Sequence, residues 1–187
     1  CNTDESEEKQ EQYLQMLLRR RIDGILLVPA SNKAAPIKLI KKQNVPVVLM
    51  DRQVPDVDVD VVRSDTEEGA YLITTHLLSL GHRQIVMLAG PQSVSTSVDR
   101  VNGYRRALRD AGLPESTESI FFGEFTQETG YTMAEQMLKD LSRTTALVAA
   151  NNFIAIGAMQ LLSEKKVCVP EDIAIVTVDD LPPALTI

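Results

Sequence analysis

Short, continuous apolar runs alternate with amphipathic stretches along most of the chain. The apolar runs are rich in Val, Ile and Leu and fall at 22–28, 45–50, 84–90, 119–125, 145–151 and 172–178. A strand that is buried on both faces gives a continuous apolar run, whereas a half-exposed strand alternates apolar and polar residues. The pattern therefore predicts six buried strands.

The stretches between these runs have the spacing of amphipathic helices. In the segment 65–80, Ala70, Ile73, Leu77 and Leu80 fall on one face. The predicted helices span about 7–20, 36–43, 65–80, 97–111, 127–140 and 153–165. Alternating strands and helices predict an α/β fold with parallel sheet covered on both faces. The segment "VPDVDVDVVRSD" has no room for a helix and is expected to be a local irregularity.

The stretch "HLLSLGHRQIVMLAG", residues 76–90, joins a helix to a strand with almost no linker. Gly81 is predicted to end the helix in a left-handed conformation, and His82 and Arg83 follow near the negative end of the helix dipole. The other histidine, His76, lies on the same helix. A Ser-His-Asp set therefore cannot be assembled, and the glycines form neither G-x-G-x-x-G nor G-x-x-x-x-G-K. We expect no enzymatic activity and no cofactor.

The charge and the cysteines narrow the class of protein further. A net charge of -7 argues against a nucleic-acid surface on this segment, and the basic run 19–21 is interpreted as a helix C-terminus. Cys1 and Cys168 allow neither a disulfide framework nor a C-x-x-C metal site. No apolar run approaches the about 18 residues that a bilayer span requires. A cytoplasmic location and no membrane partner are expected.

Polar residues gather where the predicted strands end, and ligands of open α/β sheets bind at the carboxyl ends of the strands. Five candidates for effector binding follow from this rule: Asp51, Arg100, Phe125, Asn151 and Asp179. Carboxylate and amide oxygens accept hydrogen bonds from hydroxyl groups, a guanidinium donates, and an aromatic ring covers an apolar sugar face. The set suits a polyhydroxylated ligand, with Arg100 expected at the mouth of the cleft. Each residue also has a structural alternative, namely a helix cap, a core ring or a surface helix residue.

Three stretches carry a resemblance to a known family: "DTEEGAYLITTHLLSLGHRQIVMLAGP", "SVDRVNGYRRALRDAGL" and "TALVAANNFIAIGAMQLLSEKKVCVPEDIAIVTVDDL". Together they resemble the effector-binding core of the lactose/galactose repressor (LacI/GalR) family of bacterial transcription regulators. The resemblance covers essentially the whole chain. It implies a periplasmic-binding-protein-like fold of two Rossmann-like subdomains with the effector between them, and it places the five candidates on effector-contacting positions.

The same resemblance implies an organisation for the chain and for its parent protein. Residues 1–88 with 180–187 would form an N-terminal subdomain that lacks its first strand and helix, and residues 89–179 a C-terminal subdomain, each incomplete. Crossings between them are expected near 87–91 and near Asp180. The family also has a DNA-binding headpiece, absent here, and acts as a homodimer on an operator. The chain departs from the family pattern at Asn152 and at 177–178. A periplasmic sugar-binding receptor of a transport system shares the fold and is the alternative.

Overall fold

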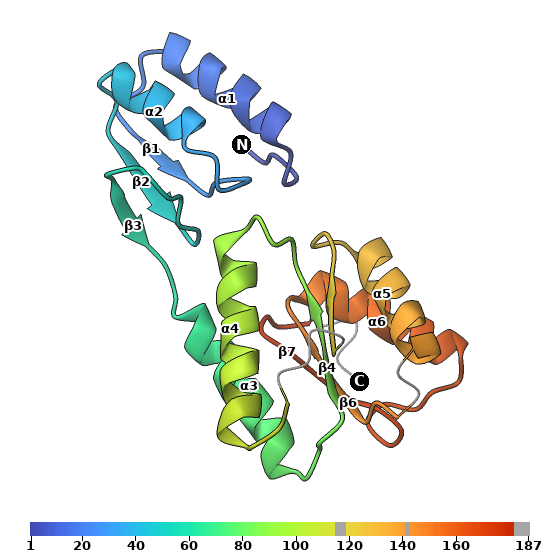
Figure 1. Ribbon diagram of the computed structural model, residues 1–187. Coiled ribbons are helices and arrows are strands. Elements are labelled where there is room, and N and C mark those ends of the chain that lie inside the picture. Colours follow the sequence, from blue (N-terminus) through green and yellow to red (C-terminus); the bar gives the residue numbers. More distant parts are fainter. Residues whose placement is uncertain (115–118, 141–142, 182–187) are drawn as a thin grey trace. The chain divides into compact units, whose positions relative to one another are not determined.

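The chain folds into two compact units. The computed structural model describes residues 1–114, 119–140 and 143–181. The first unit contains Cys1–Ser64 with Ser93–Thr96, and the second contains Asp65–Gln92 with the described residues from Ser97 onward (Figure 1).

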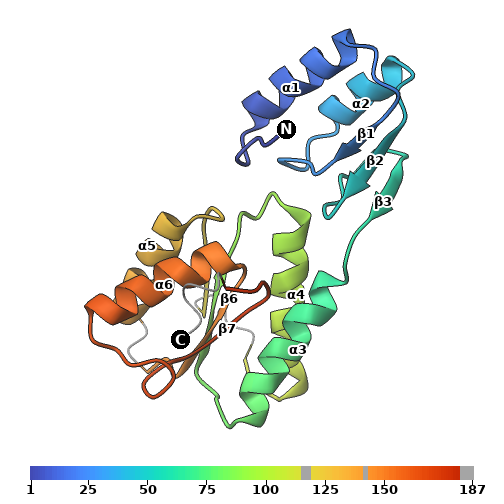
Figure 2. The same cartoon turned by 180° about the vertical axis from the view of Figure 1, so that it is seen from behind.

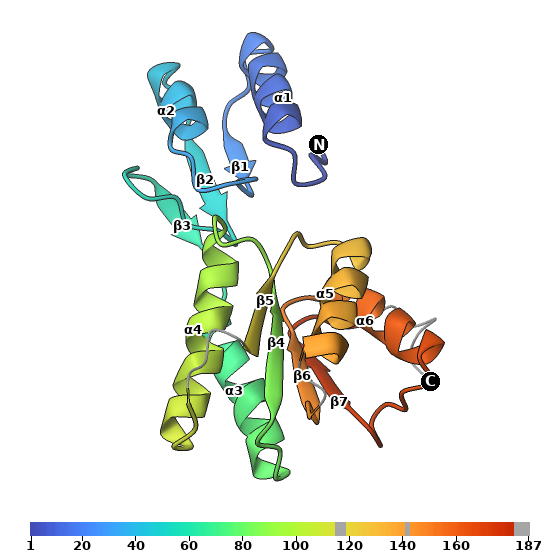
Figure 3. The ribbon, with the colours of Figure 1, turned by 45° about the vertical axis from the view of Figure 1, so that its right-hand side comes forward.

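The first unit is a three-stranded parallel sheet with helices on one face. Its elements are α1 (Glu7–Arg19), β1 (Ile25–Leu27), α2 (Ala35–Lys42), β2 (Val47–Met50) and β3 (Asp60–Val62), with strand order β1-β2-β3. Helices α1 and α2 lie on the same side of the sheet (Figure 3). Leu14 of α1 and Ile40 of α2 are buried in one core with Leu49. On the opposite face Leu26 and Val62 are exposed, so the predicted cover on both faces does not describe this unit.

The second unit is a four-stranded parallel sheet covered on both faces. Its elements are α3 (Thr66–Ser79), β4 (Ile85–Ala89), α4 (Ser95–Asp110), β5 (Ile120–Phe122), α5 (Gln127–Asp140), β6 (Ala146–Ala149), α6 (Asn152–Glu164) and β7 (Ala174–Thr177). The strand order is β5-β4-β6-β7. Helices α3 and α4 cover one face, and α5 and α6 cover the other (Figures 2 and 3). Strands β4 and β6 are buried along their whole length, as their continuous apolar runs predict.

Close helix contacts fix where α4 and α6 lie. A β-carbon at Gly103 of α4 would stand 2.1 Å from the Glu67 carbonyl oxygen of α3. Likewise, a β-carbon at Gly157 of α6 would stand 1.9 Å from the Gln127 carbonyl oxygen of α5. The buried hydroxyl of Tyr104 donates to the Ile85 carbonyl oxygen at 2.8 Å, and burial raises the pKa of Tyr104 to about 12. Helix α4 is therefore held against both α3 and the central strand β4.

The predicted α/β fold with two parallel-sheet subdomains is confirmed, because the strands expected at 45–50 and 145–151 lie in separate sheets. The boundary between the units differs from the expected one. Residues 65–88 lie in the second unit, since Leu77 of α3 packs into its core and β4 pairs with β5 and β6. The first passage between units falls between Ser64 and Asp65 rather than near 87–91. Residues 182–187, expected to return to the first subdomain, lie outside the described residues.

The stretch 76–90 has the structural role that its sequence predicts. Gly81 has a φ of 95°, and the backbone N–H of His82 donates to the Leu77 carbonyl oxygen at 3.2 Å to close the helix. The His82 ring nitrogen Nδ1 lies 3.0 Å from the Thr145 hydroxyl at the start of β6. His82 therefore belongs to a helix-to-strand junction.

Candidate functional site

Four of the five candidate residues belong to the second unit, at the edge where its strands end. All four strands run parallel, so their carboxyl ends meet at one edge. Phe125 lies in the loop between β5 and α5, since β5 ends at Phe122 and not at 125 as predicted. Asn151 follows β6, and Asp179 follows β7. Arg100 lies on α4, the helix that follows β4.

Arg100 and Phe125 contact one another beside the end of β4. The Arg100 guanidinium carbon lies 6.0 Å from the centroid of the Phe125 ring, which is within the range of a cation–π interaction. The ring also lies against the backbone of Gly90, because a β-carbon there would come within 2.2 Å of two ring atoms. The structure thus pairs a cation and an aromatic ring at the edge of the sheet.

Arg100 is more buried than the sequence analysis expected. It is 8% exposed, whereas a residue at the mouth of a cleft would be largely solvated. The reason is its helix, which the glycine contact with α3 and the Tyr104 hydrogen bond bring close to the sheet. A buried guanidinium has lost water, so its hydrogen bonds are stronger than those of a surface arginine.

Asn151 and Asp179 occupy the two neighbouring loops. The Asn151 side-chain oxygen accepts a hydrogen bond from the Ile154 backbone N–H at 3.0 Å and caps α6. This oxygen therefore has the helix-cap role that was the structural alternative to effector binding. The Asn152 side-chain nitrogen donates to the Asp180 carbonyl oxygen at 3.3 Å and links the two loops. Asp179 is exposed. One buried amide and one solvated carboxylate therefore follow β6 and β7.

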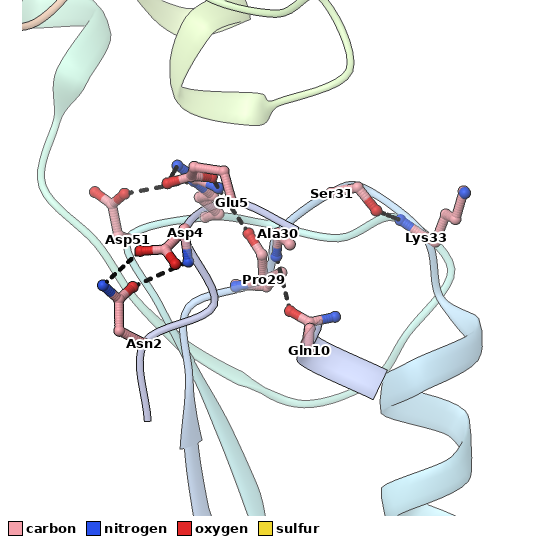
Figure 4. A network of polar contacts seen from close by, with 10 residues as sticks. Asn2, Asp4, Glu5, Gln10, Pro29, Ala30, Ser31, Lys33 and Asp51 are labelled. Atoms are coloured by element: carbon pink, nitrogen blue, oxygen red, sulfur yellow. Dashed lines mark hydrogen bonds and ion pairs between the residues drawn. The ribbon is translucent and has the colours of Figure 1, made fainter. Parts of the chain in front are cut away.

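Asp51 lies in the first unit, at the corresponding edge of its own sheet. It follows β2 directly, is exposed, and has a φ of 64°. Its carboxylate oxygen Oδ2 lies 3.8 Å from Nε of the neighbouring Arg52, which is buried. The Arg52 guanidinium in turn donates two hydrogen bonds to the Glu5 carboxylate, within the polar network that Figure 4 shows around Glu5, Pro29 and Asp51.

Two hydroxyl groups on the same elements, those of Ser97 and Thr177, were not among the residues predicted from the sequence. Ser97 is fully buried on α4, three residues before Arg100 and therefore on the same helix face. Thr177 is the last residue of β7. Within the described part of the chain, neither hydroxyl has a hydrogen-bond partner. The hydroxyl-rich sequence "QSVSTS" signalled polar groups here, but it did not indicate which hydroxyl is buried.

Neither a membrane-spanning helix nor a metal-binding cluster is present among the described residues. No described helix is both long and apolar enough to cross a membrane. No cluster of three or more His, Cys, Asp or Glu side chains that could bind a metal ion occurs in the same part of the chain.

Sequence relatives are repressors. The chain is 34% identical to the HTH-type transcriptional repressor PurR of Actinobacillus pleuropneumoniae serotype 3 (strain JL03) over 181 residues, which are 97% of this chain and 54% of that protein. It is 32% identical to PurR of Haemophilus influenzae (strain PittEE) over 182 residues, with the same coverage of 97% and 54%. The chain thus spans about half the length of the curated relatives it matches.

Solved structures with the same fold are transcription regulators. The transcription regulator CcpA of Lactococcus lactis has a TM-score of 0.86 at 28% identity, covering 95% of this chain and 65% of that one. The complex of the transcriptional regulator CelR with cellobiose has a TM-score of 0.85 at 30% identity, covering 92% and 53%. Residues 2–185 match the family described as periplasmic binding proteins and sugar binding domain of LacI family. Sequence and fold agree, and the chain belongs to this family.

Proposed function

We propose that the chain is the effector-binding core of a transcription regulator whose effector is a sugar or a related small polyol or nucleoside. The observation that carries the proposal is the pair of Arg100 and Phe125 at the strand ends of the second unit. A ring can cover the apolar face of a sugar, while a guanidinium donates to its hydroxyl oxygens. The similar structure of CelR is a complex with cellobiose, which supports a sugar as the effector.

The remaining candidates complete the proposed site. Asn151 and Asp179 from the second unit and Asp51 from the first would accept or donate hydrogen bonds around the ring of the ligand. The chemistry is binding rather than catalysis.

The proposed mechanism is a shift between arrangements of the two subdomains. An effector that contacts residues of both would favour one arrangement, and a DNA-binding headpiece of the parent protein would convert that preference into a change of operator affinity. We propose a cytoplasmic homodimer, because operators with two half-sites match proteins with two-fold symmetry.

The regulator is favoured over the alternative, a periplasmic sugar-binding receptor. The matched family includes both periplasmic binding proteins and LacI-family regulators. The relatives that are 34% and 32% identical to this chain are repressors by name. Calorimetric titration of the natural full-length protein with D-ribose, D-galactose, cellobiose, adenosine and hypoxanthine tests the effector class. Saturable binding of one sugar or nucleoside supports the proposal. Binding of hypoxanthine alone would show that the effector is a purine base and would contradict the proposed effector class.

Gly90→Ala is expected to weaken effector binding by about tenfold, which corresponds to one displaced aromatic contact. The new methyl group would stand 2.2 Å from the Phe125 ring and would push it out of its place beside Arg100. Titration calorimetry measures the loss. Gly123→Ala is a poor control because Thr129 lies close to it, whereas Gly69→Ala meets no atom within 4 Å. An unchanged affinity in Gly90→Ala would show that the ring position does not matter for binding.

A further inference from the structure

A buried arginine joins three segments of the first unit. Arg52 is 7% exposed. Its Nη1 and Nη2 donate to the two carboxylate oxygens of Glu5 at 2.5 and 2.9 Å, and Nη1 also donates to the Pro29 carbonyl oxygen at 2.9 Å. Glu5 precedes α1, and Pro29 follows β1 (Figure 4). The guanidinium therefore ties the turn before α1 and the loop after β1 to the end of β2.

The same guanidinium lies beside the candidate Asp51. Its Nε is 3.8 Å from the Asp51 carboxylate oxygen Oδ2. The Asp51 backbone has a φ of 64°, a left-handed conformation that residues other than glycine adopt infrequently, and its N–H donates to the Val62 carbonyl oxygen at 2.9 Å. The Asp51 side chain is 48% exposed, so it can still reach a ligand. Backbone and guanidinium together restrict where this carboxylate lies.

The chemistry of the pair requires arginine. A buried guanidinium is costly unless a partner satisfies it, and Glu5 does so through two parallel hydrogen bonds. A lysine ammonium is a point charge, so it cannot bind both Glu5 oxygens in a fork and face Asp51 with a third nitrogen. The planar group has one edge for Glu5 and its Nε for Asp51.

We propose that Arg52, held in place by Glu5, is a positioning residue that orients the carboxylate of Asp51 toward hydroxyl or N–H donors of the effector. The inference rests on the proposed function, in which Asp51 contacts the effector. It adds two residues behind the proposed contact: Glu5 holds the Arg52 guanidinium in place, and Arg52 in turn orients the Asp51 carboxylate.

A double-mutant cycle in the natural full-length protein tests the proposal. The probe is whichever of D-ribose, D-galactose, cellobiose and adenosine binds the wild type most tightly by calorimetry. We expect Asp51→Ala and Arg52→Lys each to weaken binding by about tenfold, the loss of one hydrogen bond to a charged group. In the Asp51→Ala background, Arg52→Lys should change the affinity by less than about twofold, because the group that it orients is gone.

A second variant separates positioning from folding. Glu5→Gln alters the pair from its half-exposed side, keeps the side-chain shape, and is expected to weaken probe binding by about threefold to tenfold. Glu11→Gln removes the same charge from the exposed surface of α1 and should leave affinity unchanged. Thermal unfolding of each variant reports folding independently of binding.

The outcomes distinguish this inference from the proposed function. If Arg100→Ala weakens binding but Arg52→Lys weakens it equally with and without Asp51, Arg52 does not act through Asp51 and the inference is overturned while the function stands. No effect of Arg52→Lys in either background overturns it as well. If neither the three sugars nor adenosine binds the wild type, the proposed sugar or nucleoside effector fails, and this inference fails with it.

Discussion

Arg100→Ala is expected to lower effector affinity by about tenfold to a hundredfold, because it removes one or more hydrogen bonds from a charged group worth about 1.5–3 kcal/mol each. It would also remove the cation that faces the Phe125 ring. Since Arg100 is only 8% exposed, the substitution also deletes packed methylene groups and is expected to lower the free energy of unfolding by about 1 kcal/mol. Titration calorimetry gives the first quantity and urea unfolding gives the second.

Two further variants make the Arg100 result interpretable. Arg100→Lys keeps the charge and most of the packing but loses the planar fork, so it should retain stability and still lose affinity. Arg109→Ala removes an arginine from the exposed last turn of the same helix and should leave affinity unchanged. Equal affinities of wild type and Arg100→Ala for the cognate ligand would return Arg100 to the role of a structural helix residue.

Gly157→Ala is expected to destabilise the second unit by about 1–3 kcal/mol, the usual cost of overpacking. The added methyl would stand 1.9 Å from the Gln127 carbonyl oxygen and 2.7 Å from the Tyr131 nitrogen, both of them backbone atoms of α5. Gly130 makes the reciprocal contact with the Ile154 backbone of α6. Backbone atoms cannot rotate away as a side chain can, so the two helices must separate.

Gly69→Ala is the matched control for Gly157→Ala. Gly69 also lies within a helix, but a β-carbon there meets no atom within 4 Å. Replacing it should raise stability by about 0.4–1 kcal/mol, because alanine restricts the unfolded chain and favours helix. The shift of the urea midpoint reports both variants. Equal midpoints for Gly157→Ala and wild type would contradict the described packing of α5 against α6.

Most strands and helices could be predicted because the buried strands leave a clear pattern. Strands β4 and β6 are covered on both sides, so every residue is apolar and the run stands out from the helices around it. Strand β3 was missed for the opposite reason. Asp60, Val61 and Val62 are all exposed at the edge of the first sheet, so burial did not select an apolar run.

The unit boundary was misplaced because an amphipathic helix does not indicate which sheet its apolar face covers. Helix α3 shows a clear apolar face that includes Leu77, yet only the three-dimensional packing assigns it to the second unit. The expected passage near residues 87–91 came from the family resemblance and not from the apolar pattern of this helix. The structure places that junction inside the second unit.

The candidate site was predictable to the level of strand ends, but not to the level of contacts. The rule that ligands meet the carboxyl ends of strands selected Arg100, Phe125, Asn151 and Asp179. It could not show that the Phe125 ring packs against the backbone of Gly90. Nor could it pair Glu5 with Arg52, which are 47 residues apart in a chain with many acidic and basic side chains.

The most direct test of the proposed function is the operator affinity of the natural full-length protein with and without its effector. Fluorescence anisotropy of labelled operator DNA measures this affinity at fixed salt concentration, because salt alone changes protein–DNA binding. The predicted result is a change of operator affinity of about fivefold or more at saturating effector, which is the range of typical allosteric coupling. In Arg100→Ala the same change should require a higher effector concentration. The same operator affinity with and without a ligand that calorimetry shows to be bound would contradict the account.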